Sequence, residues 1–272
     1  WLAAKNDIPY LVQPHGSLPQ TVGRTNLKKA WDIVIGDAII NNADGYIALH
    51  DFEADQFQGQ YGITTDDVYI VKNGFRPPDT EDTLNVDTFE QSVGIDGTKK
   101  TVLYVGRLSE RKGVDMIPDI AAQNPNLLFL IIGPDFGQEE KIKSQINRKG
   151  LNNVKYLGFV SEETKIKAYK YADIFIMPTR EGEGLPTTVL EALYYETPVV
   201  GTTAANIGFI ESSNSGIITK PTPDELTEGL STISQMNLCE MGKNGHKTVV
   251  EQFSWEEISY TLENIYEQIQ NE

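Results

Sequence analysis

Apolar residues along this chain form short runs that alternate with stretches of helical spacing. Three strands are predicted near the start: residues 10–13, 45–49 and 68–71. Apolar positions between Leu27 and Ile39 recur at helical spacing, and residues 51–57 form a second helical stretch. Strands that alternate with helices build parallel sheets, so we assign residues 1–76 to a partial α/β domain.

A second and larger group of strands follows residue 100. Six strands are predicted there: residues 101–105, 127–132, 154–157, 174–177, 198–202 and 216–219. Helices are expected around Ile117 and over residues 139–148, where Gly150 ends the second one. Because six alternating strands complete a doubly wound α/β domain, we assign residues 100–250 to such a domain.

Two further segments are interpreted as a linker and a terminal helix. Residues 77–99 begin with two prolines and are rich in acidic side chains, which is typical of a linker, here with one short helix around Phe89. A long surface loop within one domain is the alternative. Residues 251–272 are assigned to a C-terminal helix, which is predicted to start at Ser254 because Glu257 completes a capping box. Its apolar stripe is predicted to comprise Ile258, Leu262, Ile265, Tyr266 and Ile269.

The first domain is predicted to be only half of one. Three strands alone bury little apolar surface and leave a parallel edge open. The chain also begins at Trp1, inside a helical-looking phrase. We therefore expect either that a preceding segment is absent or that a partner chain covers this edge.

Composition narrows the class of protein. The 272 residues carry a net charge of −16, so nucleic acid is not expected as a partner. Cys239 is the only cysteine, which excludes an intrachain disulfide framework and a multi-cysteine zinc site. No apolar run approaches the roughly 20 residues that span a bilayer, and no signal peptide is visible. A cytoplasmic location is the default expectation.

A basic turn containing glycine follows the first strand of the second sheet. It reads Gly106-Arg107-Leu108-Ser109-Glu110-Arg111-Lys112-Gly113. Open α/β sheets bind ligands at the carboxyl ends of their strands. At such a place Gly106 lets the backbone approach a ligand, Arg107 can bind two phosphate oxygens, and Lys112 adds a point charge. A solvated basic loop is the alternative, and the turn does not fit a Walker P-loop.

A second phrase, at residues 181–192, follows the strand at residues 174–177. Pro186 suits the first turn of a helix, and the free N–H groups of a helix start suit a phosphate. Glu183 and Glu191 can accept hydrogen bonds from hydroxyl groups at either end of an extended polar ligand. Helix-dipole complementarity for Glu183 and an exposed helix position for Glu191 are the alternatives.

Together the two phrases resemble the retaining glycosyltransferases of family 4, also called glycosyl transferases group 1. The similarity rests on the G-R-x4-K-G turn and on an E-x7-E pair from Glu183 to Glu191. Further similar phrases are residues 14–19, 70–74, 154–160, 172–179, 197–202 and 253–255. The resemblance thus covers nearly the whole chain. It implies an α/β fold of GT-B type, with a complete C-terminal Rossmann-like domain and the second half of an N-terminal one.

The resemblance also implies roles for individual residues. Arg107 and Lys112 match the pair that binds the donor diphosphate, and Glu191 matches the glutamate that holds the ribose. Glu183 matches the glutamate that contacts the donor sugar, and His15 the histidine near the transferred sugar. Further donor-binding positions are implied at Gly106, Val160, Gly184, Leu185 and Pro186. Because Glu181 stands beside Glu183, the sequence leaves open which acid faces the sugar.

The implied activity is that of a retaining hexosyltransferase. It moves a sugar from a nucleotide-sugar donor to a glycan, lipid or small-molecule acceptor, with peripheral membrane contact at the inner face. Many transferases hold a metal with an Asp-x-Asp pair, which this sequence lacks, so we expect neither a metal nor another cofactor. Arg107, Lys112 and the helix start would stabilise the negative charge that builds on the leaving nucleoside diphosphate.

Two other functions stay open at this point. The chain could be a non-catalytic nucleotide-sugar-binding subunit or fragment that needs a partner, or a GT-B epimerase that acts on a nucleotide sugar. An NAD-dependent dehydrogenase is disfavoured because no dinucleotide fingerprint follows any strand. The sequence names neither the sugar, nor the base, nor the acceptor.

Overall fold

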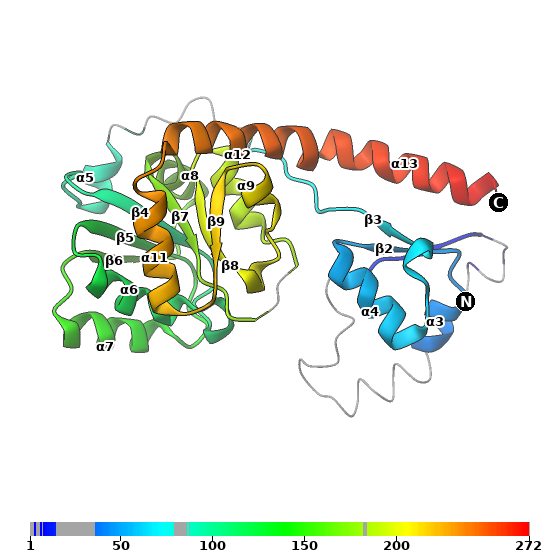
Figure 1. Cartoon of the computed structure of the whole chain (residues 1–272), viewed down its shortest axis with the longest axis horizontal. Coiled ribbons are helices and arrows are strands. Elements are labelled where there is room, and N and C mark those ends of the chain that lie inside the picture. Colours follow the sequence, from blue (N-terminus) through cyan, green and yellow to red (C-terminus); the bar gives the residue numbers. More distant parts are fainter. Residues whose placement is uncertain are drawn as a thin grey trace. The chain divides into compact units, whose positions relative to one another are not determined.

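The computed structural model describes residues 8–14, 36–78, 88–181 and 184–271, together with residues 3, 6 and 86. The chain divides into two compact units (Figure 1). One comprises Trp1–Gly74 with Phe253–Glu272, and the other comprises Phe75–Gln252. His15 and Glu183, both predicted as site residues, lie outside the described residues.

The first unit contains a parallel sheet of three strands. They are β1 (Leu11–Val12), β2 (Gly45–Ala48) and β3 (Val68–Ile70), in the order β1-β2-β3. The connecting elements are α3 (Asp37–Asn41), α4 (Asp51–Tyr61) and the 3₁₀ helix η2 (Thr65–Asp67). All three strands were predicted, whereas α4 is longer than predicted and ends only at Gly62, which has a φ of 70°. Of the helix predicted between Leu27 and Ile39, the structure describes only the end, within α3.

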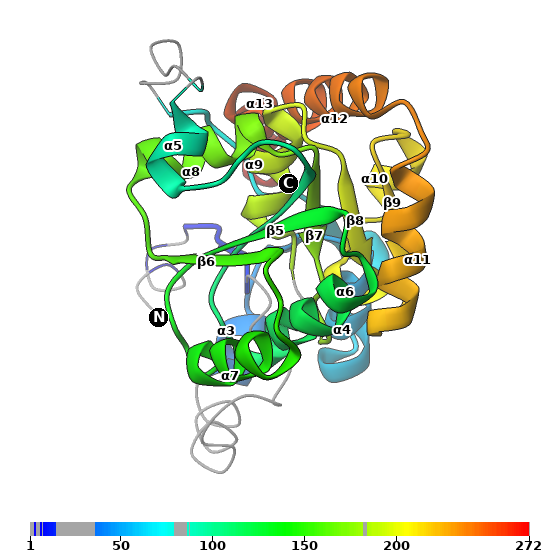
Figure 2. The ribbon, with the colours of Figure 1, turned by 90° about the vertical axis from the view of Figure 1, so that its left-hand side faces the viewer.

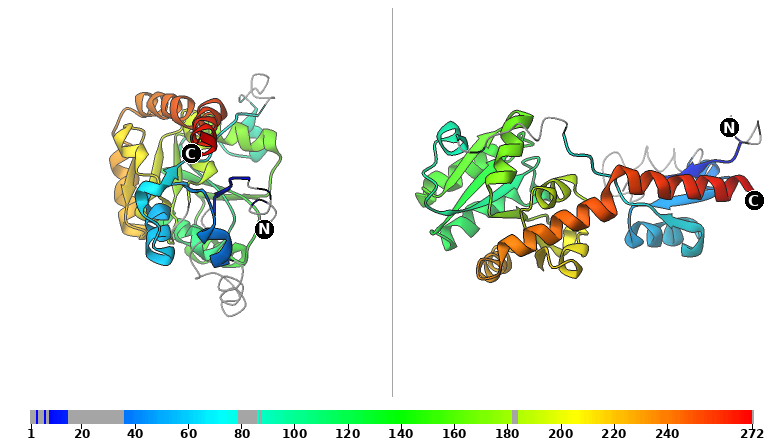
Figure 3. Two further views of the ribbon diagram at one scale, coloured as in Figure 1. Left: turned by 90° about the vertical axis from the view of Figure 1, so that its right-hand side faces the viewer. Right: turned by 90° about the horizontal axis from the view of Figure 1, so that it is seen from above.

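The C-terminal helix α13 (Trp255–Asn271) belongs to the first unit, and Figure 3 shows it running along this sheet. The Ser254 hydroxyl oxygen accepts a hydrogen bond from the N–H of Glu257 at 3.3 Å, as the capping box predicts. The buried face of α13 comprises Ile258, Ile265 and Ile269, which pack on the sheet against Ile47 and Val71. Tyr266 is 49% exposed, so its predicted place in the apolar stripe is wrong.

The second unit contains a parallel sheet of six strands, all of them predicted. They are β4 (Lys100–Val105), β5 (Leu127–Ile132), β6 (Val154–Gly158), β7 (Ile174–Met177), β8 (Val199–Thr202) and β9 (Gly216–Thr219). Their order is β6-β5-β4-β7-β8-β9, which is that of a doubly wound fold with its switch point between β4 and β7. Strands β7 and β8 are buried throughout, which explains their continuous apolar runs.

Helices cover both faces of this sheet (Figure 2). The α-helices are α5 (Phe89–Val93), α6 (Ile117–Gln123), α7 (Glu139–Lys149), α8 (Glu162–Tyr171), α9 (Thr187–Tyr194), α10 (Phe209–Ser212), α11 (Pro223–Ile233) and α12 (Leu238–Phe253). Three 3₁₀ helices are η4 (Glu110–Lys112), η5 (Val114–Met116) and η6 (Thr203–Ala205). The short helix predicted around Phe89 is α5, and its Phe89 ring packs 5.1 Å from the ring of Tyr171.

Candidate functional site

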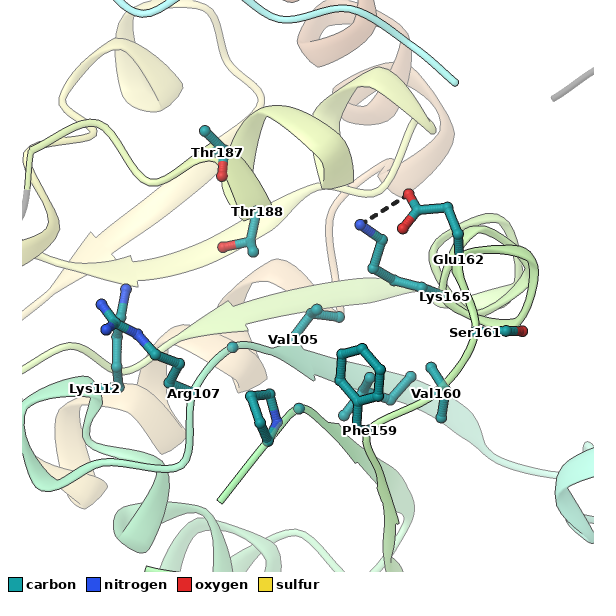
Figure 4. Close-up of a pocket in the computed structure, with 14 residues that line it drawn as sticks. Val105, Arg107, Lys112, Phe159, Val160, Ser161, Glu162, Lys165, Thr187 and Thr188 are labelled. Atoms are coloured by element: carbon teal, nitrogen blue, oxygen red, sulfur yellow. Dashed lines mark ion pairs between the residues drawn. The ribbon is translucent and has the colours of Figure 1, made fainter. Parts of the chain in front are cut away.

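A cavity of about 610 Å³ opens at the carboxyl ends of the central strands of the second unit (Figure 4). Its walls come from the ends of β4 and β5, the loop after β6, helix α8 and the start of α9. This is the neighbourhood of the switch point between β4 and β7, where open α/β sheets bind ligands. Four of the predicted donor-binding residues line it: Gly106, Arg107, Lys112 and Val160.

The turn after β4 carries two cations into the cavity. The N–H of Gly106 donates to the carbonyl of Ile132 at 3.0 Å, and the Tyr104 hydroxyl donates to the carbonyl of Arg107 at 2.9 Å. The first bond joins the start of the turn to the end of β5, and the second joins the turn to β4. Both side chains line the cavity, and Figure 4 draws them on the same side of it. Such a pair suits a group that carries two negative charges close together.

The start of α9 adds hydrogen-bond donors to the same cavity. Thr187 and Thr188 are its first two residues, and both line the cavity. The first N–H groups of a helix have no partner within the helix, and they lie at the positive end of its dipole. Two cations and a helix start therefore converge on one place, which suits phosphate oxygens. Gly184, Leu185 and Pro186 precede this helix and are not among the residues that line the cavity.

Glu191 is held by two neighbours instead of facing solvent. It lies inside α9, and its side chain is only 20% exposed, so the interpretation as an exposed helix glutamate is wrong. Its Oε1 lies 2.9 Å from Nζ of Lys165, and its Oε2 accepts a hydrogen bond from the hydroxyl of Tyr169 at 2.7 Å. Lys165 lines the cavity and also pairs with Glu162 at 3.0 Å. Glu191 thus reaches the edge of the cavity through its lysine partner.

The surroundings of Lys165 and Tyr169 keep both side chains protonated. Burial opposes the charge on Lys165, but Glu191 and Glu162 outweigh it and raise the pKa of the ammonium group. Burial, with Glu191 beside it, raises the pKa of the Tyr169 hydroxyl well above its usual value, so this hydroxyl stays a donor. Among the described lining residues, three are cationic and one is anionic. The cavity is therefore a positive site within an acidic chain, and it favours an anionic ligand.

The loop after β6 gives the cavity an apolar end. Val160 lies there, next to Phe159, a residue that is 83% exposed. An exposed aromatic ring at the rim of a cavity offers a flat apolar surface to a planar ligand. Ser161 then caps the start of α8, since its hydroxyl oxygen accepts a hydrogen bond from the N–H of Thr164 at 3.2 Å.

Ten of the fourteen lining residues were not predicted as site residues, among them Phe159, Lys165, Thr187 and Thr188. The phrase Ser161-Glu162-Glu163-Thr164 is a helix-start signal that could have predicted α8. No sequence signal joins Lys165 to Glu191, because the two are 26 residues apart and on different helices. The pairing exists only through the tertiary structure.

The part of the chain that the structure describes contains no group of three or more His, Cys, Asp or Glu side chains that could hold a metal ion. Nor does any described helix have the length and apolar character needed to cross a membrane.

The fold is of the GT-B type, as superposition on two solved structures shows. HepE of Anabaena in complex with UDP superposes with a TM-score of 0.79 at 22% identity, over 99% of this chain and 74% of that one. Sucrose-phosphate synthase of Thermosynechococcus elongatus superposes with a TM-score of 0.76 at 20% identity, over 100% of this chain and 71% of that one. The predicted fold class is thereby confirmed.

The chain belongs to the family Glycosyl transferases group 1, whose sequence model matches residues 85–248. An uncharacterized glycosyltransferase of Methanocaldococcus jannaschii is 28% identical over 218 residues, which are 76% of this chain and 55% of that protein. A second relative is the GDP-mannose-dependent monoacylated alpha-(1-6)-phosphatidylinositol monomannoside mannosyltransferase of Corynebacterium glutamicum. It is 28% identical over 188 residues, which are 64% of this chain and 49% of that protein. The chain spans about half the length of these two relatives. The resemblance inferred from the two phrases is confirmed.

Proposed function

We propose that this chain binds the nucleotide-sugar donor of a retaining glycosyltransferase that works without a metal ion. The observation that carries the proposal is the convergence of Arg107, Lys112 and the start of α9 on one cavity at the switch point of the sheet. Residues 100–250 would form the donor-binding domain, and residues 1–76 would belong to the acceptor side, joined by residues 77–99 and followed by the helical segment 251–272.

The cavity offers a place for each part of the donor. Its cationic side and the first N–H groups of α9 would bind the diphosphate. The pair of Lys165 and Glu191 would hold the ribose, because it offers a donor and an acceptor side by side. The exposed ring of Phe159, together with Val160, would contact the base. Stacking on an aromatic ring suits any nucleobase, so the base itself stays open.

The proposed chemistry follows from where charge develops. When the bond between the anomeric carbon and the phosphate oxygen breaks, its electrons remain on the leaving nucleoside diphosphate. Arg107, Lys112 and the α9 dipole would stabilise this developing charge more strongly than the charge of the intact donor. They supply the positive charge that the step needs, which is why we propose transfer without a metal. Retention is what the family resemblance implies.

The sugar-side roles rest on the resemblance. We propose Glu183 at the donor sugar, with Gly184, Leu185 and Pro186 presenting backbone near it, and His15 near the transferred sugar. A UDP or GDP donor is favoured, because HepE of Anabaena was solved with UDP-glucose and the Corynebacterium relative is GDP-mannose-dependent. The acceptor would be a glycan, lipid or small molecule. The setting would be the cytoplasm, with peripheral contact at the inner face of the membrane.

A donor incubation tests this proposal, with mass spectrometry to detect transfer or hydrolysis and proton NMR to distinguish epimers of equal mass. A thermal-shift panel of UDP-, GDP- and ADP-sugars first selects the donor that raises the melting temperature most. Incubation of that donor with the chain, and with a full-length relative, then separates three functions. Transfer or slow hydrolysis supports a glycosyltransferase, an epimerised donor indicates an epimerase, and a bound but intact donor indicates a binding subunit. No stabilisation by any donor would contradict the proposal as a whole.

A further inference from the structure

Arg180, which follows β7 by three residues, ties this segment to the turn that carries Lys112. Its backbone N–H donates to the carbonyl of Arg111 at 2.9 Å, and its Nη1 donates to the carbonyl of Glu110 at 3.1 Å. These two carbonyls belong to the residues immediately before Lys112. The turn is thereby held from outside at the two peptide units that set the direction of the Lys112 side chain.

The guanidinium of Arg180 is itself held in place by a carboxylate. Both of its Nη atoms bond to Asp115, with Nη2 3.2 Å from Oδ2. Asp115 is only 7% exposed, and Nζ of Lys141 lies 2.9 Å from its Oδ2. A planar guanidinium group bonded to both oxygens of a buried carboxylate has one defined orientation. The Nη1 atom that donates to the Glu110 carbonyl is therefore fixed as well.

The backbone around Arg180 leaves little room for movement. The carbonyl of the preceding residue, Thr179, accepts a hydrogen bond from the hydroxyl of Thr202 at 2.6 Å. The turn also packs closely on this segment, because a Cβ placed on Gly113 would lie 1.9 Å from the carbonyl oxygen of Pro178. Arg180 therefore connects two backbone segments that already pack against each other: its own segment after β7 and the turn that carries Lys112.

We propose that Arg180 is a positioning residue for the donor diphosphate, acting through the turn that presents Lys112 to the cavity. The inference rests on the proposed function. Arg180 is not among the residues that line the cavity, so it would act without touching the phosphates. Its bond to the Glu110 carbonyl would keep the turn in its binding conformation before the ligand arrives, which lowers the cost of ordering this turn on binding.

The test compares the affinity for a diphosphate with that for the bare nucleoside. UDP, GDP and ADP, and uridine, guanosine and adenosine, are titrated into the full chain by calorimetry, with NMR for the weak ligands. The variants are Arg180→Met, Arg180→Lys, Lys112→Ala and the double variant Arg180→Met with Lys112→Ala. Lys141→Met is the matched control, because it removes the other cation of Asp115 and has no hydrogen bond to the turn among the described residues.

Arg180→Met should weaken diphosphate binding by up to about tenfold, the loss expected for one charge-assisted hydrogen bond. Nucleoside affinity should stay within about twofold. Arg180→Lys should lose part of the effect, because an ammonium group lacks the fork that reaches Asp115 and Glu110 together. Lys141→Met should lower the melting temperature and leave the diphosphate preference intact. The double variant should bind no more weakly than Lys112→Ala alone, since both changes act on the same contact.

Two results would overturn the inference while the proposed function stands. The first is a wild-type preference for the diphosphate that persists in Arg180→Met and Arg180→Lys. The second is an additive loss in the double variant, which would show that Arg180 acts independently of Lys112. A wild-type chain that binds none of the three diphosphates would instead contradict the proposed function, and the inference with it.

Discussion

Lys165 and Glu191 form an ion pair at the edge of the cavity, with Nζ 2.9 Å from Oε1. The Tyr169 hydroxyl donates a hydrogen bond to the other oxygen of Glu191 at 2.7 Å, so both carboxylate oxygens have a partner. A carboxylate can accept about four hydrogen bonds, and within the described part of the chain Glu191 accepts two. The pair therefore keeps acceptor capacity on Glu191 next to a donor on Lys165, a combination that suits hydroxyl groups such as those of the proposed ribose.

Glu191→Gln should weaken the binding of nucleoside and nucleoside diphosphate alike, because both carry the ribose. A hydrogen bond to a charged group contributes about 1.5–3 kcal/mol, so the expected loss is roughly tenfold or more. Calorimetry with the diphosphate and its 2′- and 3′-deoxy analogues measures it. Wild type should prefer the ribose form, and Glu191→Gln should lose most of that preference.

Lys165→Met should also weaken the binding of nucleoside and nucleoside diphosphate alike, because it leaves Glu191 without its cation. Lys167→Met is the control on the same helix, since Lys167 pairs with Glu163 at 2.7 Å and is not among the lining residues. Equal affinity of wild type for ribose and deoxyribose ligands would show that this pair only stabilises the fold.

Lys112→Ala should weaken nucleoside diphosphate binding by roughly tenfold or more, since one charge-assisted contact is lost. Affinity for the bare nucleoside should barely change. Arg111→Ala is the control, because Arg111 lies in the same 3₁₀ helix and does not line the cavity. Equal losses for diphosphate and nucleoside would assign Lys112 to the fold instead of the phosphates.

Gly113→Ala should destabilise the second unit strongly. Gly113 has a φ of 68°, and its Cβ would meet the carbonyl oxygen of Pro178 at 1.9 Å. Gly150→Ala is the control, because Gly150 has a φ of 63° and, apart from its chain neighbours, no described residue would come within 4 Å of its Cβ. Urea unfolding should show a loss of about 1–2 kcal/mol for Gly150→Ala and of about 3 kcal/mol or more for Gly113→Ala. Similar losses would mean that the contact with Pro178 is unimportant.

Asp115 should contribute stability that depends on pH. Burial opposes its ionisation, but Arg180 and Lys141 outweigh burial and lower the pKa of the carboxyl. A lowered folded-state pKa stabilises the protein above the unfolded-state pKa, and this contribution is lost as the pH falls through the folded-state value. The difference in free energy of unfolding between wild type and Asp115→Asn should therefore be largest above about pH 5 and shrink toward pH 2. A difference independent of pH would contradict the assignment.

Much of the fold was predictable because buried parallel strands have a simple signal. The boundaries of β5, β7 and β9 agree with the apolar runs at residues 127–132, 174–177 and 216–219. The end of α4 was less clear, because the polar residues after Phe57 carry no apolar period and only Gly62 ends the helix. Tyr266 fits the helical spacing and yet faces solvent, since spacing defines a stripe and not its width.

The site was predictable only where it lies in local phrases. Arg107 and Lys112 stand in one turn of recognisable sequence, and the structure places both at the cavity. Arg180 and Asp115, by contrast, are 65 residues apart, and each looks like an ordinary surface charge in the sequence. Contacts between distant charged residues depend on the order of the strands, which no local pattern contains.

We propose that the cavity at the switch point binds a nucleoside diphosphate through protein groups alone. The decisive experiment is isothermal titration calorimetry of the whole chain with UDP, GDP and ADP, in buffer containing a metal chelator. At least one of the three should bind, with an affinity unchanged when magnesium replaces the chelator. No binding of any of them at millimolar concentration, or binding only with the metal present, would contradict it.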